Sequence, residues 1–135
     1  MPTGIWRTII AIALAGHGLG HVFFLIPALG IAKWGQEVHS WLLSPIAGGA
    51  LTRPMGSLLW ILVTAGFITA GVGVFTTHPW WRDVAITSAI VSLLAIGIFA
   101  SGLPLNPTIN PVLFDIAVLA ALLWAHWPPA ELVGS

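Results

Sequence analysis

Residues 5–29 read IWRTIIAIALAGHGLGHVFFLIPAL and contain a single charged side chain, Arg7. A helix that crosses a bilayer needs about 20 mostly apolar residues, so this run predicts a transmembrane helix. A cleavable signal peptide has a shorter apolar core followed by small residues such as Ala13-Leu14-Ala15. Because the apolar run continues well beyond that point to Leu29, we expect it to be retained as the first span.

The composition of the whole chain also indicates a membrane protein. Of its 135 residues, 58% are hydrophobic and 6% are charged, whereas about 25% of the residues in a soluble domain are charged. The zero net charge argues against a nucleic-acid partner, and the absence of cysteine excludes disulfides and thiolate metal sites. We therefore expect an integral, multi-pass membrane protein whose partners are the lipid bilayer and other membrane subunits or further copies of the chain.

Three further apolar runs are long enough to span a bilayer, and stretches rich in proline and polar residues separate them. The backbone must satisfy its own hydrogen bonds in lipid, so each run is expected to be a helix. The prediction is a single all-α domain, residues 1–135, folded as a membrane four-helix bundle with spans at 5–29, 55–75, 84–103 and 111–127.

The first connection, about residues 30–54, carries a helical pattern of its own. Trp34, Val38, Trp41 and Leu42 follow one another at spacings i, i+4, i+7 and i+8, with polar side chains between them. This pattern predicts a short amphipathic helix that lies in the membrane interface. An irregular loop anchored by its tryptophans is the alternative.

Three ionisable side chains fall inside the predicted spans and away from their ends: His17, His21 and Asp115. Such residues are costly in a membrane and usually face a partner or a cavity. At 1.5 Å per helical residue, His17 lies near the midplane and His21 about 12 Å from the end of the first span. Asp115 lies about 8 Å beyond Asn110, where the last span was expected to enter. We therefore expect His21 and Asp115 to be neighbours.

This set of residues admits several interpretations. His17 and His21 share one helix face because they are four residues apart. Together with Asp115 they would supply three metal ligands, the number found in many catalytic zinc and non-haem iron sites. Alternatively, one of the two histidines would bind a haem or a chlorophyll-type pigment. The histidines could also form a structural network with Asp115 and backbone carbonyls, a proton relay, or the lining of a small-molecule pocket.

Several features taken together resemble a known family. They are the motif HGLGH at 17–21, the turn Trp80-Trp81-Arg82, the sequence Ser92-Leu93-Leu94 and the approach to the last span from Asn106 to Asn110. The chain resembles the small bacterial four-helix membrane proteins of the DoxX-like type, and departs from them in its proline-rich last turn and long first connection. The resemblance implies location in the bacterial inner membrane and an accessory role beside membrane redox enzymes. It carries over no catalytic residue.

The sequence thus leads to two functional expectations. The first is an accessory, non-catalytic subunit of a larger redox or energy-converting membrane complex, in which His17 and His21 pack in the bundle or contact a haem or chlorophyll-type cofactor. The second is a small membrane enzyme or carrier with a pocket or metal site lined by His17, His21 and Asp115. No HExxH motif, phosphate-binding glycine loop or nucleophile elbow is present, so the sequence leaves open whether the protein is an enzyme.

Overall fold

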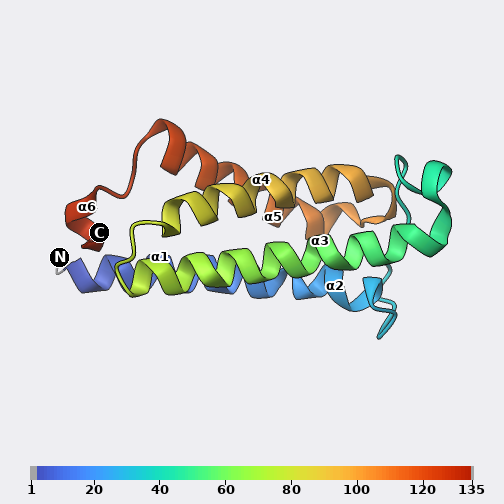
Figure 1. Ribbon diagram of the computed structural model, residues 1–135, viewed down its shortest axis with the longest axis horizontal. Coiled ribbons are helices and arrows are strands. Elements are labelled where there is room, and N and C mark those ends of the chain that lie inside the picture. The colour runs from blue at the N-terminus through green and yellow to red at the C-terminus, as the bar shows by residue number, and fades with distance from the viewer. Residues whose placement is uncertain (1–2, 135) are drawn as a thin grey trace.

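The structure, a computed structural model, describes residues 3–134, and every regular element among them is helical (Figure 1). Residues 3–28 form one long helical rod that is interrupted only at His21. In chain order the elements are α1 (Thr3–Gly20), α2 (Val22–Ala28), α3 (Ser44–Phe75), α4 (Trp81–Phe99), the 3₁₀ turn η1 (Ala100–Gly102), α5 (Leu105–Leu119), the π-helical turn η2 (Ala120–Trp124) and α6 (Ala130–Val133). The prediction of an all-α fold is confirmed.

The long helices lie side by side, and each packs against the next one in the chain (Figure 1). The rod of α1 and α2 packs on α3, α3 packs on α4, and α4 packs on α5, whereas α1 and α5 contact each other at only a few points. At one end the short α6 returns to α1, so the two ends of the described chain lie together. The result is a four-helix bundle with one loosely closed side, between α1 and α5.

Four helical stretches are long and apolar enough to cross a membrane: Gly4–Ala28, Ser44–Phe75, Trp81–Gly102 and Leu105–Trp124. Large apolar side chains point outward from all of them. The exposed side chains include Ile12, Leu58, Leu94 and Leu113. The bundle therefore presents an apolar exterior as well as an apolar core.

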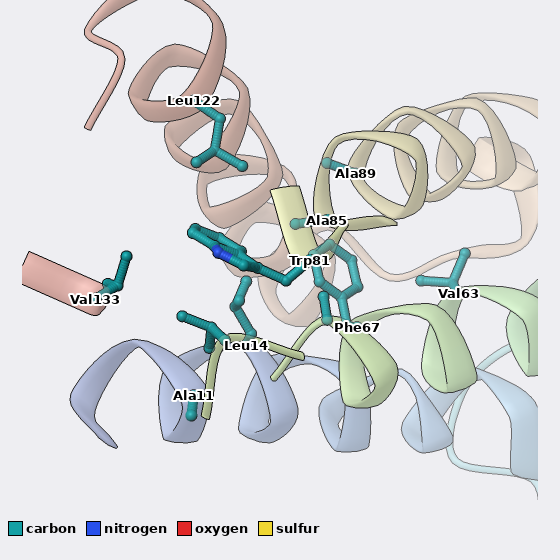
Figure 2. Packing of buried hydrophobic residues seen from close by; sticks show 11 residues of the cluster. Ala11, Leu14, Val63, Phe67, Trp81, Ala85, Ala89, Leu122 and Val133 are labelled. Atoms are coloured by element: carbon teal, nitrogen blue, oxygen red, sulfur yellow. The ribbon is translucent and has the colours of Figure 1, made fainter. Parts of the chain in front are cut away.

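The core at one end of the bundle is built around Trp81, which is 1% exposed (Figure 2). Side chains from α1, α3, α4, η2 and α6 surround it, including Leu14, Phe67, Leu122 and Val133. The burial of Val133 in this cluster explains why the chain returns to α1 after the last long helix. A second cluster at the other end contains Phe24, Trp60 and Phe99.

Glycine allows α1 and α3 to approach closely. A Cβ atom on Gly18 would lie 2.9 Å from the backbone oxygen of Thr64 and 2.9 Å from Cβ of Phe67. One on Gly71 would lie 2.8 Å from the backbone oxygen of Ala11. Small residues that let helix backbones meet are typical of packing between apolar helices.

Two of the predicted spans begin earlier than expected. The second helix begins at Ser44 rather than Met55, and the fourth begins at Leu105 rather than Pro111. Proline is tolerated in the first turn of a helix, where its missing N–H has no partner to lose. That rule covers Pro45 and Pro107, in the first turns of α3 and α5, whereas Pro54 and Pro111 lie further inside the two helices and do not mark their starts.

The stretch around Trp34–Leu42 is not helical, and the predicted amphipathic helix is absent there. Its hydrogen bonds are made instead with the end of α4 and with η1: the Glu37 backbone N–H donates to Gly102, the Ser40 hydroxyl to Ile98 and the Trp41 indole N–H to Gly97. Gly30 and Gly35 adopt positive φ angles of +76° and +74°. The stretch is therefore an irregular strap, defined here as residues 30–43, across this end of the bundle.

Candidate functional site

His17, His21 and Asp115 meet in the interior of the bundle. Nε2 of His17 lies 2.8 Å from Oδ1 of Asp115 and 3.2 Å from Nε2 of His21. One ligand atom from each of the three side chains lies within 4.8 Å of the other two. Asp115 and His21 are fully buried, and the His17 side chain is 9% exposed. The three ionisable residues that the sequence placed inside the spans thus form one cluster.

The pairing within this cluster differs from the sequence prediction. Asp115 contacts His17, not His21, which was the expected neighbour. The reason is the earlier start of α5: Asp115 lies ten residues beyond Leu105, or about 15 Å along the helix axis, which brings it level with His17. His21 instead contacts α4, where the Ser92 hydroxyl lies 3.3 Å from its Nε2.

Aromatic rings fix the orientation of both imidazoles. The His17 ring stacks on Phe114 with 4.0 Å between ring centroids and meets the edge of Phe67 at 4.6 Å. The His21 ring lies 6.0 Å from Trp60 and 5.8 Å from Phe24. These supporting rings were not predicted from the sequence, although Phe114 is adjacent to Asp115 in the chain.

Nε2 of His17 lies within hydrogen-bond distance of two partners, so its protonation decides which of the two contacts can be a hydrogen bond. An imidazole nitrogen carries either one N–H or one lone pair in the ring plane. If His17 donates this N–H to Asp115, the nitrogen cannot accept a hydrogen bond from His21. If it accepts from His21 instead, it has no proton to donate to the carboxylate. A single proton must therefore be shared between two contacts, unless a cation occupies the point where the lone pairs converge.

Two further atoms of the cluster have no hydrogen-bond partner among residues 3–134: Oδ2 of Asp115 and Nδ1 of His21. Oγ1 of Thr64, on α3, is also buried without a partner. Buried polar atoms are rarely left unpaired, and an exception calls for an unseen ion or water, or for a catalytic role. The protein atoms alone therefore do not satisfy the cluster.

A cavity of about 470 Å³ reaches both histidines from the loosely closed side of the bundle. Its lining comes from α1 and α2 on one side and from α5 on the other, and is mostly apolar. Asp115 lies behind His17 and does not line it. The lining residues are Ala13, Gly16, His17, Gly20, His21, Phe23, Phe24, Pro107, Asn110, Pro111 and Phe114. A second, apolar cavity of about 280 Å³ lies on the same side, beyond Phe114 and towards Trp127.

The glycines next to the two histidines, Gly16, Gly18 and Gly20, have two different roles. The spacing of Gly16 and Gly20 predicts close helix packing, but a Cβ on either of them would meet no atom within 4 Å. Both line the cavity instead. Gly18, on the opposite face, makes the close approach to α3. The motif therefore combines a packed face with an open one.

Comparisons of this chain with models of protein families, with curated proteins and with solved structures found no match. The DoxX-like resemblance accordingly stays a prediction, and the function has to be argued from the site itself.

Proposed function

We propose that this chain is an integral, multi-pass membrane protein that binds one divalent transition-metal ion between His17, His21 and Asp115. The observation that carries this proposal is the convergence of one ligand atom from each residue within 4.8 Å, deep in an apolar bundle. The length of the four apolar stretches and the outward-facing isoleucines and leucines on them support placement in a bilayer.

Two of the three distances between ligand atoms in the cluster fit a shared ion. Zinc binds histidine nitrogen and carboxylate oxygen at about 2.0–2.2 Å, so two ligands of one ion lie about 3–3.4 Å apart. The contacts of His17 with Asp115 and His21, at 2.8 Å and 3.2 Å, are close to that separation. An ion would use the lone pairs of both histidines at once and remove the competition for one proton.

Charge balance supports the same assignment. With both histidines neutral, Asp115 is a fully buried carboxylate without a compensating charge, which is strongly unfavourable in an apolar interior. A divalent cation supplies that compensation, and Oδ2 of Asp115 offers it a further ligand atom. Protonation of His17 is the alternative and would turn the contact into a buried ion pair.

Two histidines and one carboxylate leave coordination positions open. Sites with three protein ligands are typical of catalytic zinc, where a water or a substrate completes the shell, and of non-haem iron centres. The cavity beside His17 and His21 gives a small apolar molecule a route from the lipid to such a position. This arrangement favours the expectation of a small membrane enzyme or carrier. The accessory-subunit role stays a prediction.

The geometry favours a single ion over a haem or chlorophyll-type pigment. Nε2 of His17, the atom that would bind the metal of such a ring, faces Asp115 and His21 at hydrogen-bond distance. A macrocycle extends sideways from its central metal in all directions, and these two side chains occupy that space. His21 is enclosed by Phe24, Trp60 and Phe67.

Metal analysis tests the proposal directly. Protein purified in mild detergent and equilibrated with Zn²⁺, Fe²⁺ or Co²⁺ is expected to retain about one ion per chain. Asp115→Asn is expected to lower the affinity at least tenfold, because the anionic ligand is lost. The matched control is His39→Asn: His39 is exposed, and within residues 3–134 its side chain hydrogen-bonds only Ser101. If none of the three metals binds stoichiometrically, the cluster is a proton-sharing network and the proposal is wrong.

Cobalt spectroscopy tests the open position. Azide added to the Co²⁺-loaded protein is expected to shift the visible absorption bands, because it enters the coordination shell. Gly20→Leu should abolish this shift while metal is retained, since the leucine side chain fills the cavity and Gly20 has no neighbour within 4 Å to clash with. An equal shift in the variant would mean that the cavity is not the route to the ion.

A further inference from the structure

A third cavity, of about 650 Å³, lies at the end of the bundle where the strap crosses the beginning of α3. It lies more than one helical turn beyond the histidines, and none of the three proposed metal ligands lines it. Its basic side chains are Lys33, from the strap, and Arg53, from α3. This cavity is separate from the candidate metal site and has no role in it.

Basic residues are concentrated in this cavity. The chain has four lysines and arginines in total, and two of them line this one space. Neither Lys33 nor Arg53 makes an ion pair within residues 3–134, although the Glu37 side chain is also part of the lining. Two unpaired cations in one hollow create a favourable place for an anion.

The beginning of α3 adds to this positive potential. The helix is interrupted at Gly48, whose φ and ψ angles are 69° and 169°. The regular helix thus starts again at Gly49 and Ala50, and both residues line the cavity. The positive end of the α3 dipole therefore lies beside Lys33 and Arg53.

An apolar groove of about 430 Å³ continues from the cavity along the outside of the bundle. Arg53 and Pro54 line both spaces, so the two are contiguous. From there the groove runs between the end of α2 and α3, past Leu58 and Ile61. A cationic hollow at the end of the helices that leads into an apolar groove along them matches a molecule with an anionic head and a long apolar tail.

We infer that this cavity and groove bind one anionic phospholipid. Lys33 and Arg53 hold its phosphate, and one acyl chain lies in the groove beside Leu58 and Ile61. This inference rests on the proposed placement in a membrane, because it puts the end of α3 at the level of the lipid headgroups. It does not depend on the metal site.

Native mass spectrometry of the protein in detergent tests the inference with phosphatidylglycerol and phosphatidylcholine of the same acyl chains. Each cation near an anionic headgroup strengthens binding about fivefold. Lys33 and Arg53 together therefore predict a preference of about 25-fold for phosphatidylglycerol over phosphatidylcholine. Lys33→Gln/Arg53→Gln should abolish this preference. Arg7→Gln, which removes a cation at the other end of the bundle, should leave it unchanged.

If the wild-type protein does prefer phosphatidylglycerol, two results would still overturn the lipid site. One is a preference for phosphatidylglycerol that survives in Lys33→Gln/Arg53→Gln. The other is displacement of the lipid by glycerol phosphate or inorganic phosphate at equal concentration, which would make this a site for a soluble anion. Extraction of membranes with alkaline carbonate tests the proposed membrane placement separately from the lipid site. Release of the wild-type protein contradicts membrane insertion, whereas a retained protein without lipid preference contradicts the lipid site alone.

Discussion

His17→Leu is expected to be the most damaging single substitution in the cluster, lowering the free energy of unfolding by about 3–5 kcal/mol. It removes a metal ligand and, in the same step, the residue that contacts Asp115 at 2.8 Å. Without the ion that His17 helps to bind, the carboxylate is fully buried with neither a compensating charge nor this contact. Removing one member of a buried charged pair is costly because the other remains desolvated. Unfolding in detergent, followed by circular dichroism with and without Zn²⁺, measures the loss.

The double variant His17→Leu/Asp115→Leu separates the charge effect from metal binding. Replacing both partners of a buried pair with apolar residues is often neutral or stabilising. The double variant should therefore recover most of the stability of the metal-free wild type but none of its metal binding. If it is as unstable as His17→Leu alone, the loss comes from disturbed packing against Phe114 and Phe67 rather than from the unpaired carboxylate.

Gly18→Ala is expected to destabilise the protein by about 1–3 kcal/mol, the usual cost of overpacking. The new Cβ would lie 2.9 Å from the Thr64 backbone oxygen, which cannot move without moving α3. Gly18→Leu should prevent the bundle from assembling. The measurement is thermal unfolding in the same detergent, together with the yield of monodisperse protein.

Gly16→Ala and Gly20→Ala are the matched controls. Unlike Gly18→Ala, they are expected to leave the free energy of unfolding unchanged or to raise it. No atom lies within 4 Å of a Cβ at either position, and alanine is favoured over glycine in a helix by about 1 kcal/mol. Both variants should therefore be as stable as the wild type or slightly more so. Equal destabilisation at all three glycines would contradict the packed and open faces assigned to this motif.

The number of long helices could be predicted from the sequence because length and apolar character belong to each run separately. The starts of two of them could not. Prolines at 54 and 111 were taken as boundaries, yet both lie inside helices. The strap was mispredicted for another reason: Glu37, Ser40 and Trp41 make their hydrogen bonds with Gly102, Ile98 and Gly97, which are about 60 residues away in the chain. Local periodicity contains no information about such partners.

The members of the candidate site could be predicted, but their pairing could not. His17, His21 and Asp115 stand out because ionisable residues are rare in apolar helices. Which of them touch depends on where α5 begins. Moving that start from Asn110 to Leu105 changes the depth of Asp115 by about 7 Å. The supporting rings of Phe67 and Phe114 could not be distinguished in the sequence from ordinary core residues.

On the loosely closed side of the bundle, α1 contacts the C-terminal part of the chain at two places. At one end α6 returns to α1, and near the middle the side chains of Phe114 and Asp115 meet His17. The apolar cavity beyond Phe114 lies between these two contacts, whereas the cavity at His17 and His21 lies past the second one. Phe114 lines both cavities, so its ring separates the space that reaches the histidines from the purely apolar space beyond it.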